Sequence, residues 1–343
     1  MKTHLGSSKN ATLRDVASRA GVSVATASRV LSGSAAVRPG TRERVERAAR
    51  ELLYVAPGRT EATGAIGLLV PEFGNPVFAA LSQSMETRAT DAGFATIICN
   101  TGGSARREVD YVHMLLERRV DGMVFICAEV TDTRGEHTHY RQLLELGARL
   151  VFVNGGSERL PVTSVGVDER FSGRLATDHL LSLGHRRIGF AAGEEWALPA
   201  RQKLRGRADA LRAAGIDPAP HVAHTQFTVA GGRAALRELM AEPASAPTGV
   251  ICSNDLIAIG VIQEAATRGL RVPDDLSVVG FDGIDAARWL RPSLTTVAQP
   301  IDEIAATTVD ALRALIDDPT LHLPHYVFRP VLQQGGTTAP PVS

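Results

Sequence analysis

The chain of 343 residues has few cysteines and no long apolar run, and both absences exclude whole classes of protein. Its three cysteines, Cys99, Cys127 and Cys252, lie far apart in apolar segments. This spacing indicates buried, reduced thiols and excludes a disulfide framework or a cysteine metal site. No run approaches the roughly 20 apolar residues of a membrane span, and the N-terminal residues contain no apolar core of a secretion signal. We therefore expect a cytoplasmic protein without a membrane partner.

The sequence also lacks the motifs of common catalytic and nucleotide sites. It contains no P-loop, no G-x-S-x-G elbow and no H-E-x-x-H helix. Paired glycines such as Gly102-Gly103 lack the order that cradles a dinucleotide. The nearby histidines His137 and His139 have no third ligand at a useful spacing, so we expect them on the surface of a polar loop. No catalytic residue, metal or cofactor is expected, and we do not expect an enzyme.

The net charge is zero, but the charged residues are unevenly distributed. Residues 1–60 hold eleven Lys and Arg against four Asp and Glu, a surplus of seven that leaves the remaining chain at −7. A basic module attached to an acidic body fits a polyanionic partner for the first part only. A charge surplus by itself is equally typical of a solvated surface.

The stretch Thr12–Leu31 has the pattern of a helix-turn-helix. Its first residue and Asp15 form a capping signal, and apolar residues then recur along one helical face until Gly21. Ser23 can cap a second helix, whose other face ends in an arginine. A third amphipathic helix is expected from about Thr41 to Leu53. A helix pair of this kind places its second helix in the major groove of DNA.

From Ile66 onward, short apolar runs alternate with helical patterns. This alternation predicts parallel strands buried on both faces, arranged as two doubly wound α/β halves with a seam near Asn154–Asp168. The carboxyl ends of the strands in the two halves then face each other across a cleft. The expected helices cover residues 77–92, 106–117, 140–146, 204–214, 232–240, 255–268 and 302–316, and one terminal strand covers 326–332.

Several motifs in order resemble the LacI/GalR family of bacterial transcriptional regulators. They are TLRDVASRAGVSVATASRVLSG, TRERVERAARELLY, IGLLVPEFGNPVF, RRVDGMVF, HLLSLGHRRIGF, SNDLIAIGVI and SVVGFD, spread from about Thr12 to Pro330. The resemblance implies an all-α helix-turn-helix headpiece at 1–54, a short linker at 55–64, and a core at 65–335 like a periplasmic binding protein. It also implies a homodimer or tetramer that reads a pseudo-palindromic operator, and a core that binds a small effector. Since no heptad tail follows Pro330, we expect no tetramer built by a C-terminal coiled coil.

The resemblance places the base-reading positions at Val24, Ala25 and Arg29. An arginine can donate two hydrogen bonds to guanine, whereas valine and alanine offer only apolar contacts and depart from a polar reader. Other hydroxyl side chains are candidates for phosphate contacts, which set register without reading sequence. These are Thr12, Ser23, Thr26 and Ser28. Each hydroxyl is as readily a helix cap or a solvated group, and the arginine can also form a surface ion pair.

The linker departs from the family pattern. Family members follow the third helix with a hinge helix whose leucine wedges into the minor groove and kinks the DNA. Here Tyr54-Val55-Ala56-Pro57 runs almost directly into GRTEATGAIG, so the segment is several residues shorter than in the family. No leucine occurs between Tyr54 and Leu68. We expect this protein to bend its operator less than its relatives do, or to dock through the headpieces alone.

A sugar site needs planar donors and carboxylates for hydroxyl groups and an aromatic face for the ring. The resemblance places the effector-binding arginine at Arg201, while Asp282 and Asn254 each follow a predicted buried strand. The further candidates for the effector site are Phe73, Asn154, Trp196, Phe227 and Gln299. The alternatives are a turn or cap role for the aspartate and core packing for the phenylalanines. Asp255 is expected to cap the helix that follows it.

These observations predict a sequence-specific DNA-binding regulator, a repressor that a small carbohydrate releases from its operator. One alternative is a regulator of the same family in which the ligand strengthens DNA binding, so that a purine or another metabolite acts as corepressor. A second alternative is a sugar-binding protein without a gene-regulatory role, which would need no helix-turn-helix. An enzyme on the same α/β scaffold lacks a nucleophile and base in this sequence.

Overall fold

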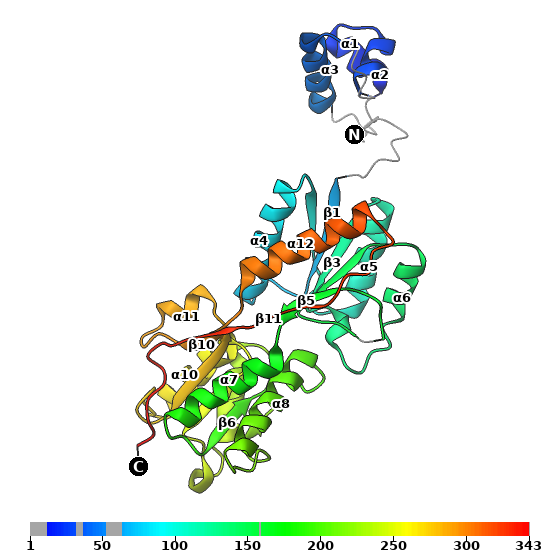
Figure 1. Ribbon diagram of the computed structural model, residues 1–343. Helices are drawn as coiled ribbons and strands as arrows, with labels where there is room; N and C mark the ends of the chain where they lie inside the picture. The colour runs from blue at the N-terminus through cyan, green and yellow to red at the C-terminus, as the bar shows by residue number, and fades with distance from the viewer. Residues whose placement is uncertain (1–11, 32–36, 53–63, 158, 343) are drawn as a thin grey trace, which may run out of the picture. The chain divides into compact units, whose positions relative to one another are not determined.

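The computed structural model of the protein describes residues 12–31, 37–52, 64–157 and 159–342 (Figure 1). The chain divides into two compact units, Met1–Glu61 and Ala62–Ser343. Apart from Gly64, the predicted linker at 55–64 lies outside the described residues. The prediction about the hinge helix concerns the same segment and also lies outside them. Within the described chain, no helix combines the length and the apolar character needed to cross a bilayer.

The first unit contains the three predicted helices. They are α1 (Leu13–Ala20), α2 (Val24–Leu31) and α3 (Pro39–Glu51). The capping signal forms as expected, because the backbone N–H of Thr12 donates to Asp15 Oδ2 over 2.7 Å and the backbone N–H of Asp15 donates to the threonine hydroxyl over 3.4 Å. Gly21 closes α1 with a left-handed φ of 64°. Val16, with no exposed surface, lies in the small core that the three helices share.

The first half of the second unit, the N-subdomain, is a six-stranded sheet with the order β11-β5-β4-β3-β1-β2, and every pair in it is parallel. Its strands are β1 (Ala65–Val70), β2 (Ala95–Asn100), β3 (Gly122–Ile126), β4 (Leu150–Val153), β5 (Ser164–Val167) and β11 (Tyr326–Phe328). The helices are α4 (Pro76–Asp91), α5 (Ala105–Glu117), α6 (Thr138–Glu145) and α12 (Ile301–Asp317). Side chains alternate between the faces: Leu68 packs with α4 and α12, whereas Leu69 packs with α5 and α6.

The second half, the C-subdomain, repeats this plan with the strand order β12-β10-β9-β8-β6-β7, in which only β12 runs antiparallel to its neighbour. Its strands are β6 (Ile188–Ala191), β7 (Val222–Ala223), β8 (Gly249–Cys252), β9 (Ser277–Asp282), β10 (Thr295–Ala298) and β12 (Val331–Gln333). The helices are α7 (Glu169–Ser182), α8 (Leu198–Ala213), α9 (Val229–Leu239), α10 (Asp255–Thr267) and α11 (Asp285–Trp289). The two doubly wound sheets confirm the predicted α/β class.

The chain crosses between the subdomains at three places: after Asp168, at Gln299–Pro300 and at Arg329–Pro330. The prediction of one terminal strand at 326–332 is therefore wrong. Residues 326–328 join the first sheet as β11, and residues 331–333 join the second as β12. Pro330 has no N–H to donate, so one continuous ladder cannot run through it.

Helices α7 and α8 pack at close range because each contributes a glycine. A Cβ atom on Gly173 would strike the backbone of Lys203, and one on Gly206 would strike the backbone of Arg170. Helices α9 and α10 pack with the same reciprocal arrangement. This approach brings the side chains at the start of α7 within reach of α8, which matters for the site described next.

Candidate functional site

The predicted DNA-reading residues lie on the solvent side of the first unit. Val24 is 43% exposed, and Ala25, Ser28 and Arg29 are exposed beside it. The exposed Val24 side chain is accessible for an apolar base contact. The Arg29 Nε–H donates to the Ala25 carbonyl over 3.3 Å, which holds the arginine along this face.

Three of the four hydroxyl candidates in this unit, Thr12, Ser23 and Thr26, have structural partners. The Ser23 hydroxyl accepts from the Thr26 backbone N–H over 3.2 Å, so it caps α2. The two hydroxyl oxygens of Ser23 and Thr26 also lie 2.9 Å apart. Thr12 is engaged in the cap of α1. Phosphate contact by Thr12, Ser23, Thr26 and Ser28 stays a prediction, and it is compatible with these caps because a hydroxyl can both donate and accept.

Four polar side chains form a continuous chain of hydrogen bonds between the two subdomains. Asn75 Nδ2 donates to Asp282 Oδ2 over 3.4 Å, and Gln299 Nε2 donates to Asp282 Oδ1 over 2.8 Å. Asn154 Nδ2 donates in turn to Gln299 Oε1 over 2.7 Å. We call Asn75, Asp282, Gln299 and Asn154 the polar chain. Three of its members were predicted from the sequence, and Asn75, the cap of α4, was missed.

The polar chain lies at the carboxyl ends of the strands, where parallel sheets bind ligands. Asp282 is the last residue of β9, Asn154 follows β4 and Gln299 follows β10. Asn154 and Asp282 both have positive φ angles, of 50° and 119°, which residues other than glycine rarely adopt. Strained backbone of this kind persists where the surrounding structure holds it, often at functional positions.

The carboxyl groups of Asp282 and Asp255 share this region. Burial raises the pKa of Asp282 to about 8, and the charge of Asp255 adds to the rise. Burial also raises the pKa of Asp255 to about 7, against hydrogen bonds from Thr296 and from backbone N–H groups. Together the two carboxyls carry less than two full negative charges at neutral pH, because burial disfavours the charged form of each and the charge of Asp255 further opposes ionisation of Asp282.

The expectation that Asp255 caps α10 is wrong. Asn254 performs that role, since its Oδ1 accepts the Ile257 N–H over 2.8 Å. The buried Asp255 carboxylate instead accepts from the Thr296 hydroxyl over 2.6 Å and from the Gly283 N–H over 2.9 Å. Sequence proximity to the helix start suggested a cap, but the donors that satisfy this carboxylate come from distant segments.

The candidates Asn254 and Phe227 form a second group. Asn254 Nδ2 donates to the Phe227 carbonyl over 3.3 Å, and the Phe227 ring packs against Gly193, where a Cβ would collide with it. Phe73, in the loop after β1, has a side chain that is 47% exposed. Phe73 thus belongs to the N-subdomain and Phe227 to the C-subdomain.

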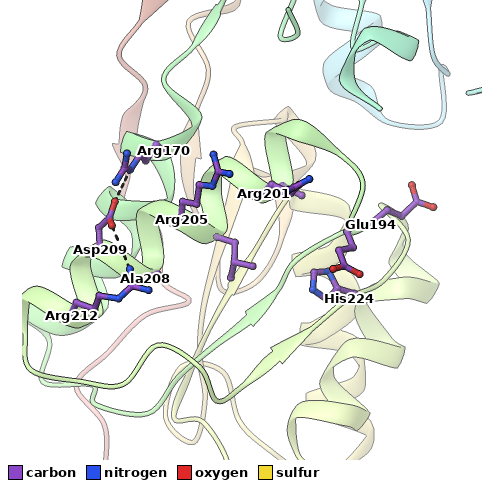
Figure 2. Close-up of a pocket in the computed structure, with 11 residues that line it drawn as sticks. Arg170, Glu194, Arg201, Arg205, Ala208, Asp209, Arg212 and His224 are labelled. Atoms are coloured by element: carbon purple, nitrogen blue, oxygen red, sulfur yellow. Dashed lines mark hydrogen bonds and ion pairs between the residues drawn. The ribbon is translucent and has the colours of Figure 1, made fainter. Parts of the chain in front are cut away.

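The candidates Trp196 and Arg201 belong to a third group, away from the polar chain. Arg201 Nη1 donates to the Thr133 hydroxyl of the N-subdomain over 3.0 Å. Arg201 and Arg205 line a groove of about 580 Å³, and Figure 2 shows both side chains on the same helix, α8. Asp282, Asn154 and Gln299 do not line this groove.

The sequence reasoning missed a buried ion pair next to Asp282. Lys203 Nζ lies 2.7 Å from Glu169 Oε2 and 3.7 Å from the centroid of the Phe281 ring. Lys203 is only 5% exposed. Burial raises the pKa of Glu169 despite the attraction of the ammonium. The sequence did contain a signal for this pair. Lys203 lies two positions after Arg201, and residues two apart on a helix point to nearly opposite faces.

Cys127 lies in the same electrostatic environment, which disfavours its thiolate form. Burial raises its pKa to about 12, and the nearby carboxylates of Glu169 and Asp282 add to the rise while Lys203 opposes it. A thiol reacts mainly as the thiolate. Cys127 is a free cysteine, but it is only partly buried, whereas Cys99 and Cys252 are buried as predicted.

One group of described side chains has the chemistry of metal ligands. Glu108, Glu129 and His139 have ligand atoms within 4.8 Å of one another. The Glu108 carboxylate already accepts from His139 Nε2 over 3.0 Å, from the Tyr140 hydroxyl and from the Glu129 N–H over 3.1 Å. The expected surface position is wrong for His139, whose side chain is 17% exposed. It lies in the first turn of α6 and turns inward with Tyr140.

Comparison with known proteins extends over both compact units. Residues 12–56 match the family described as "Bacterial regulatory proteins, lacI family", and residues 177–338 match the "Periplasmic binding protein-like domain". The "Uncharacterized HTH-type transcriptional regulator in aml 5'region" of Streptomyces limosus is 40% identical over 333 residues, covering 95% of this chain and 94% of that protein.

Two solved structures share the fold over nearly the whole chain. The lac repressor dimer bound to operator and the anti-inducer ONPF has a TM-score of 0.82 and 26% identity, covering 96% of this chain and 100% of that chain. The complex of the transcriptional regulator CelR with cellobiose has a TM-score of 0.73 and 30% identity, covering 95% of this chain and 99% of that chain.

Proposed function

Since the chain belongs to the lacI family of bacterial regulatory proteins, we propose that it is a repressor that a small carbohydrate releases from operator DNA. One observation carries this proposal. A single chain joins a helix-turn-helix with an exposed second helix to a core in which polar side chains of two subdomains meet at strand ends. The similar structures, one with an operator and one with cellobiose, support both halves of the proposal.

The proposed organisation follows the predicted boundaries. The headpiece at 1–54 reads one half-site, the linker at 55–64 connects it, and the core at 65–335 binds effector and a second copy of the chain. A homodimer on a pseudo-palindromic operator matches two-fold protein symmetry to two-fold DNA symmetry. The protein acts in the cytoplasm, bound to the nucleoid in its repressing state. Its relatives are transcriptional regulators. Binding of DNA and effector accounts for the proposed repressor role without a catalytic step.

In the headpiece, Arg29 is the proposed direct reader of guanine. Val24 and Ala25, which are exposed beside it, supply apolar contacts such as those to a thymine methyl group. The hydroxyl groups around α2 set the register on the phosphates. Removal of the arginine would therefore change base preference, whereas loss of a phosphate contact weakens binding to all sequences alike.

In the core, the proposed effector displaces hydrogen bonds within the polar chain. Asp282 supplies a carboxylate for sugar hydroxyls, while Asn154, Gln299 and Asn254 supply amide groups that both donate and accept. Lys203 lies close enough to act on the charge of Asp282, since its ammonium lowers the pKa of that carboxyl. Phe73, Trp196 and Phe227 are the candidate stacking surfaces, and Arg201 is the candidate donor from α8.

Release of DNA requires that the sugar prefers one of two arrangements of the subdomains. A ligand shifts an equilibrium only by its difference in affinity for the two states. Because the polar chain has members on both subdomains, a sugar bound there contacts both and favours the arrangement in which they are close. The coupling is reciprocal, so operator binding lowers sugar affinity by the same factor.

The test is a gel shift of chromosomal DNA fragments with purified protein, repeated with a panel of sugars and purines. We expect a retained fragment that one sugar releases. A purine that strengthens retention would support the corepressor alternative, and absence of any retained fragment would favour a sugar-binding protein without a regulatory role.

Two variants assign the sites. Arg29→Ala should lower affinity for the operator by about 5- to 150-fold and relax one base position, since a bidentate pair contributes ~1–3 kcal/mol of discrimination. The exposed Arg44 on α3 offers a control, because Arg44→Ala should leave base preference unchanged. Asp282→Asn should retain operator binding and lose the sugar response; a normal response would remove Asp282 from the site.

A further inference from the structure

Three side chains with metal-binding atoms converge inside the N-subdomain, and none of them belongs to the polar chain. Glu108 lies on α5, Glu129 begins the 3-10 turn η1 (Glu129–Thr131), and His139 lies in the first turn of α6. One ligand atom of each lies within 4.8 Å of the other two. The group is enclosed, because Glu108 is 2% exposed and the side chain of His139 is 17% exposed.

The Glu108 carboxylate is held through both of its oxygens. Its Oε1 accepts from His139 Nε2 over 3.0 Å and from the Tyr140 hydroxyl. Its Oε2 accepts from the Glu129 backbone N–H over 3.1 Å. The Tyr140 ring is fixed in turn, since it packs edge-on against the buried rings of Phe125 and Phe152. Hydrogen bonds of this kind, from groups behind the ligands, orient the ligands of metal sites.

Glu129 places a second carboxylate beside the first. Among the residues that the structure describes, its side chain makes no hydrogen bond and no ion pair, although it is only partly exposed. Two carboxylates this close repel each other, and partial burial strengthens the repulsion. The imidazole N–H of His139 serves Glu108 alone, whereas a metal ion between the three residues would bind both carboxylates.

The distances suit a small transition-metal ion. Zinc bonds of about 2.0–2.2 Å in a tetrahedron separate neighbouring ligand atoms by about 3.4 Å. His139 Nε2 and Glu108 Oε1 are already 3.0 Å apart, and no pair of the three ligand atoms exceeds 4.8 Å. The Glu129 side chain has no hydrogen bond to lose within the described chain as it closes the remaining distance.

We propose that Glu108, Glu129 and His139 bind one divalent transition-metal ion such as zinc, which ties α5, η1 and α6 together. His139 Nε2 and one oxygen of each carboxylate are the protein ligands, and a water completes four-coordination. In the neutral imidazole the proton then resides on Nδ1, which leaves Nε2 for the metal. One nitrogen and two oxygens favour zinc over calcium or magnesium, which prefer oxygen ligands throughout.

A search of the sequence for ligands at short spacing misses this site. Glu108 lies 31 positions before His139, and Glu129 precedes the same histidine in a separate turn. The lack of a third ligand close to His137 and His139 therefore does not exclude a metal site, because packing of α5 against α6 and η1 supplies the other ligands.

Calorimetric titration of the full chain with zinc chloride, after treatment with a chelator, tests the proposal. We expect one zinc ion per chain and a higher thermal unfolding midpoint with added zinc, because an ion that binds only the folded state stabilises it. Cobalt chloride in place of zinc should produce the visible absorption of a four-coordinate cobalt site.

Two variants locate the ion. Glu129→Gln removes a ligand without removing a side-chain hydrogen bond of the described structure, so it should remain folded and weaken zinc binding by at least about 10-fold. His139→Phe keeps a ring beside Tyr140, where the two centroids are 3.8 Å apart, and should abolish the one-to-one binding. Glu145→Gln, at the exposed end of α6, is the matched control and should bind zinc like the parent.

A parent protein that binds no zinc would overturn the proposal and leave Glu108, His139 and Tyr140 as a structural hydrogen-bond network. Zinc binding that is unchanged in both variants would also overturn it, since the ion would then lie elsewhere. Full binding in Glu129→Gln would remove that carboxylate and with it the three-ligand site. If His139→Phe does not fold, Glu129→Gln decides alone. These measurements use neither DNA nor sugar, so their outcome is independent of the proposed function.

Discussion

Lys203 Nζ lies 2.7 Å from Glu169 Oε2 and 3.7 Å from the centroid of the Phe281 ring, so one ion pair joins α7, α8 and β9. The side chains of Lys203 and Glu169 are 6% and 13% exposed. A charge pair this deeply buried loses most of its hydration, and the attraction between the partners offsets only part of that loss. The raised pKa of Glu169 shows that, for this carboxylate, burial outweighs the attraction.

Lys203→Met should therefore lower the free energy of unfolding by about 3–5 kcal/mol, because it leaves the Glu169 carboxylate buried without a counter-charge. The double variant Lys203→Met with Glu169→Leu should recover most of this loss. Urea denaturation followed by circular dichroism measures both. Equal losses in the single and double variants would show that packing around the pair, and not the unpaired charge, sets the cost.

The raised pKa values of Asp282 and Asp255 predict that stability falls as pH rises. Between the unfolded value near 4 and the folded values of about 8 and about 7, the folded state binds more protons than the unfolded state. The contribution of the pair is thus fully present below about pH 4 and is lost as pH rises through that window. Each carboxyl contributes a slope of at most about 1.4 kcal/mol per pH unit.

Asp282→Asn should flatten this pH dependence between about pH 5 and 8, since an amide does not titrate. Unfolding free energies from urea titrations at several pH values provide the measurement. Asp285→Asn, at an exposed position on α11, serves as the control and should keep the slope of the parent. An unchanged slope in Asp282→Asn would show that this carboxyl ionises in the folded state as readily as in the unfolded chain.

Gly206→Ala should destabilise the core by about 1–3 kcal/mol or more. The added Cβ would collide with the backbone of Arg170, which cannot move without separating α7 from α8. Gly40, in α3, is a contrasting glycine, since a Cβ there meets no atom within 4 Å. Gly40→Ala should be neutral or stabilise its own unit by up to about 1 kcal/mol through helix propensity. Thermal unfolding of both variants checks the contrast, which would fail if Gly206→Ala unfolded like the parent.

Operator bending should be smaller than in relatives with a leucine-bearing hinge. Between Tyr54 and Leu68 the chain has no leucine to insert at a base step, and such wedges unstack the step to kink the duplex. A circular-permutation gel assay on a bound operator measures the bend. A sharp kink at the centre of the operator would contradict this expectation and would require another apolar side chain from the linker.

Local signals were sufficient to predict much of the fold. The cap at Thr12 and the left-handed turn at Gly21 depend on neighbours within a few residues, so the boundaries of α1 follow from the sequence. Strands buried on both faces read as continuous apolar runs. Helix α7 escaped prediction because small residues such as Ser172, Gly173 and Ala176 form its buried face, and they do not make an apolar stripe.

The sequence by itself determined the helix-turn-helix, the two α/β halves and the polar residues at strand ends, because periodicity and capping are local. The tertiary structure alone decided which of these residues meet. Asn75 reaches Asp282 across 207 positions of the chain, and Arg201 turns toward Thr133 while Lys203 turns inward. These pairings depend on three crossings between subdomains and on the rotation between neighbouring positions of a helix, which no local pattern records.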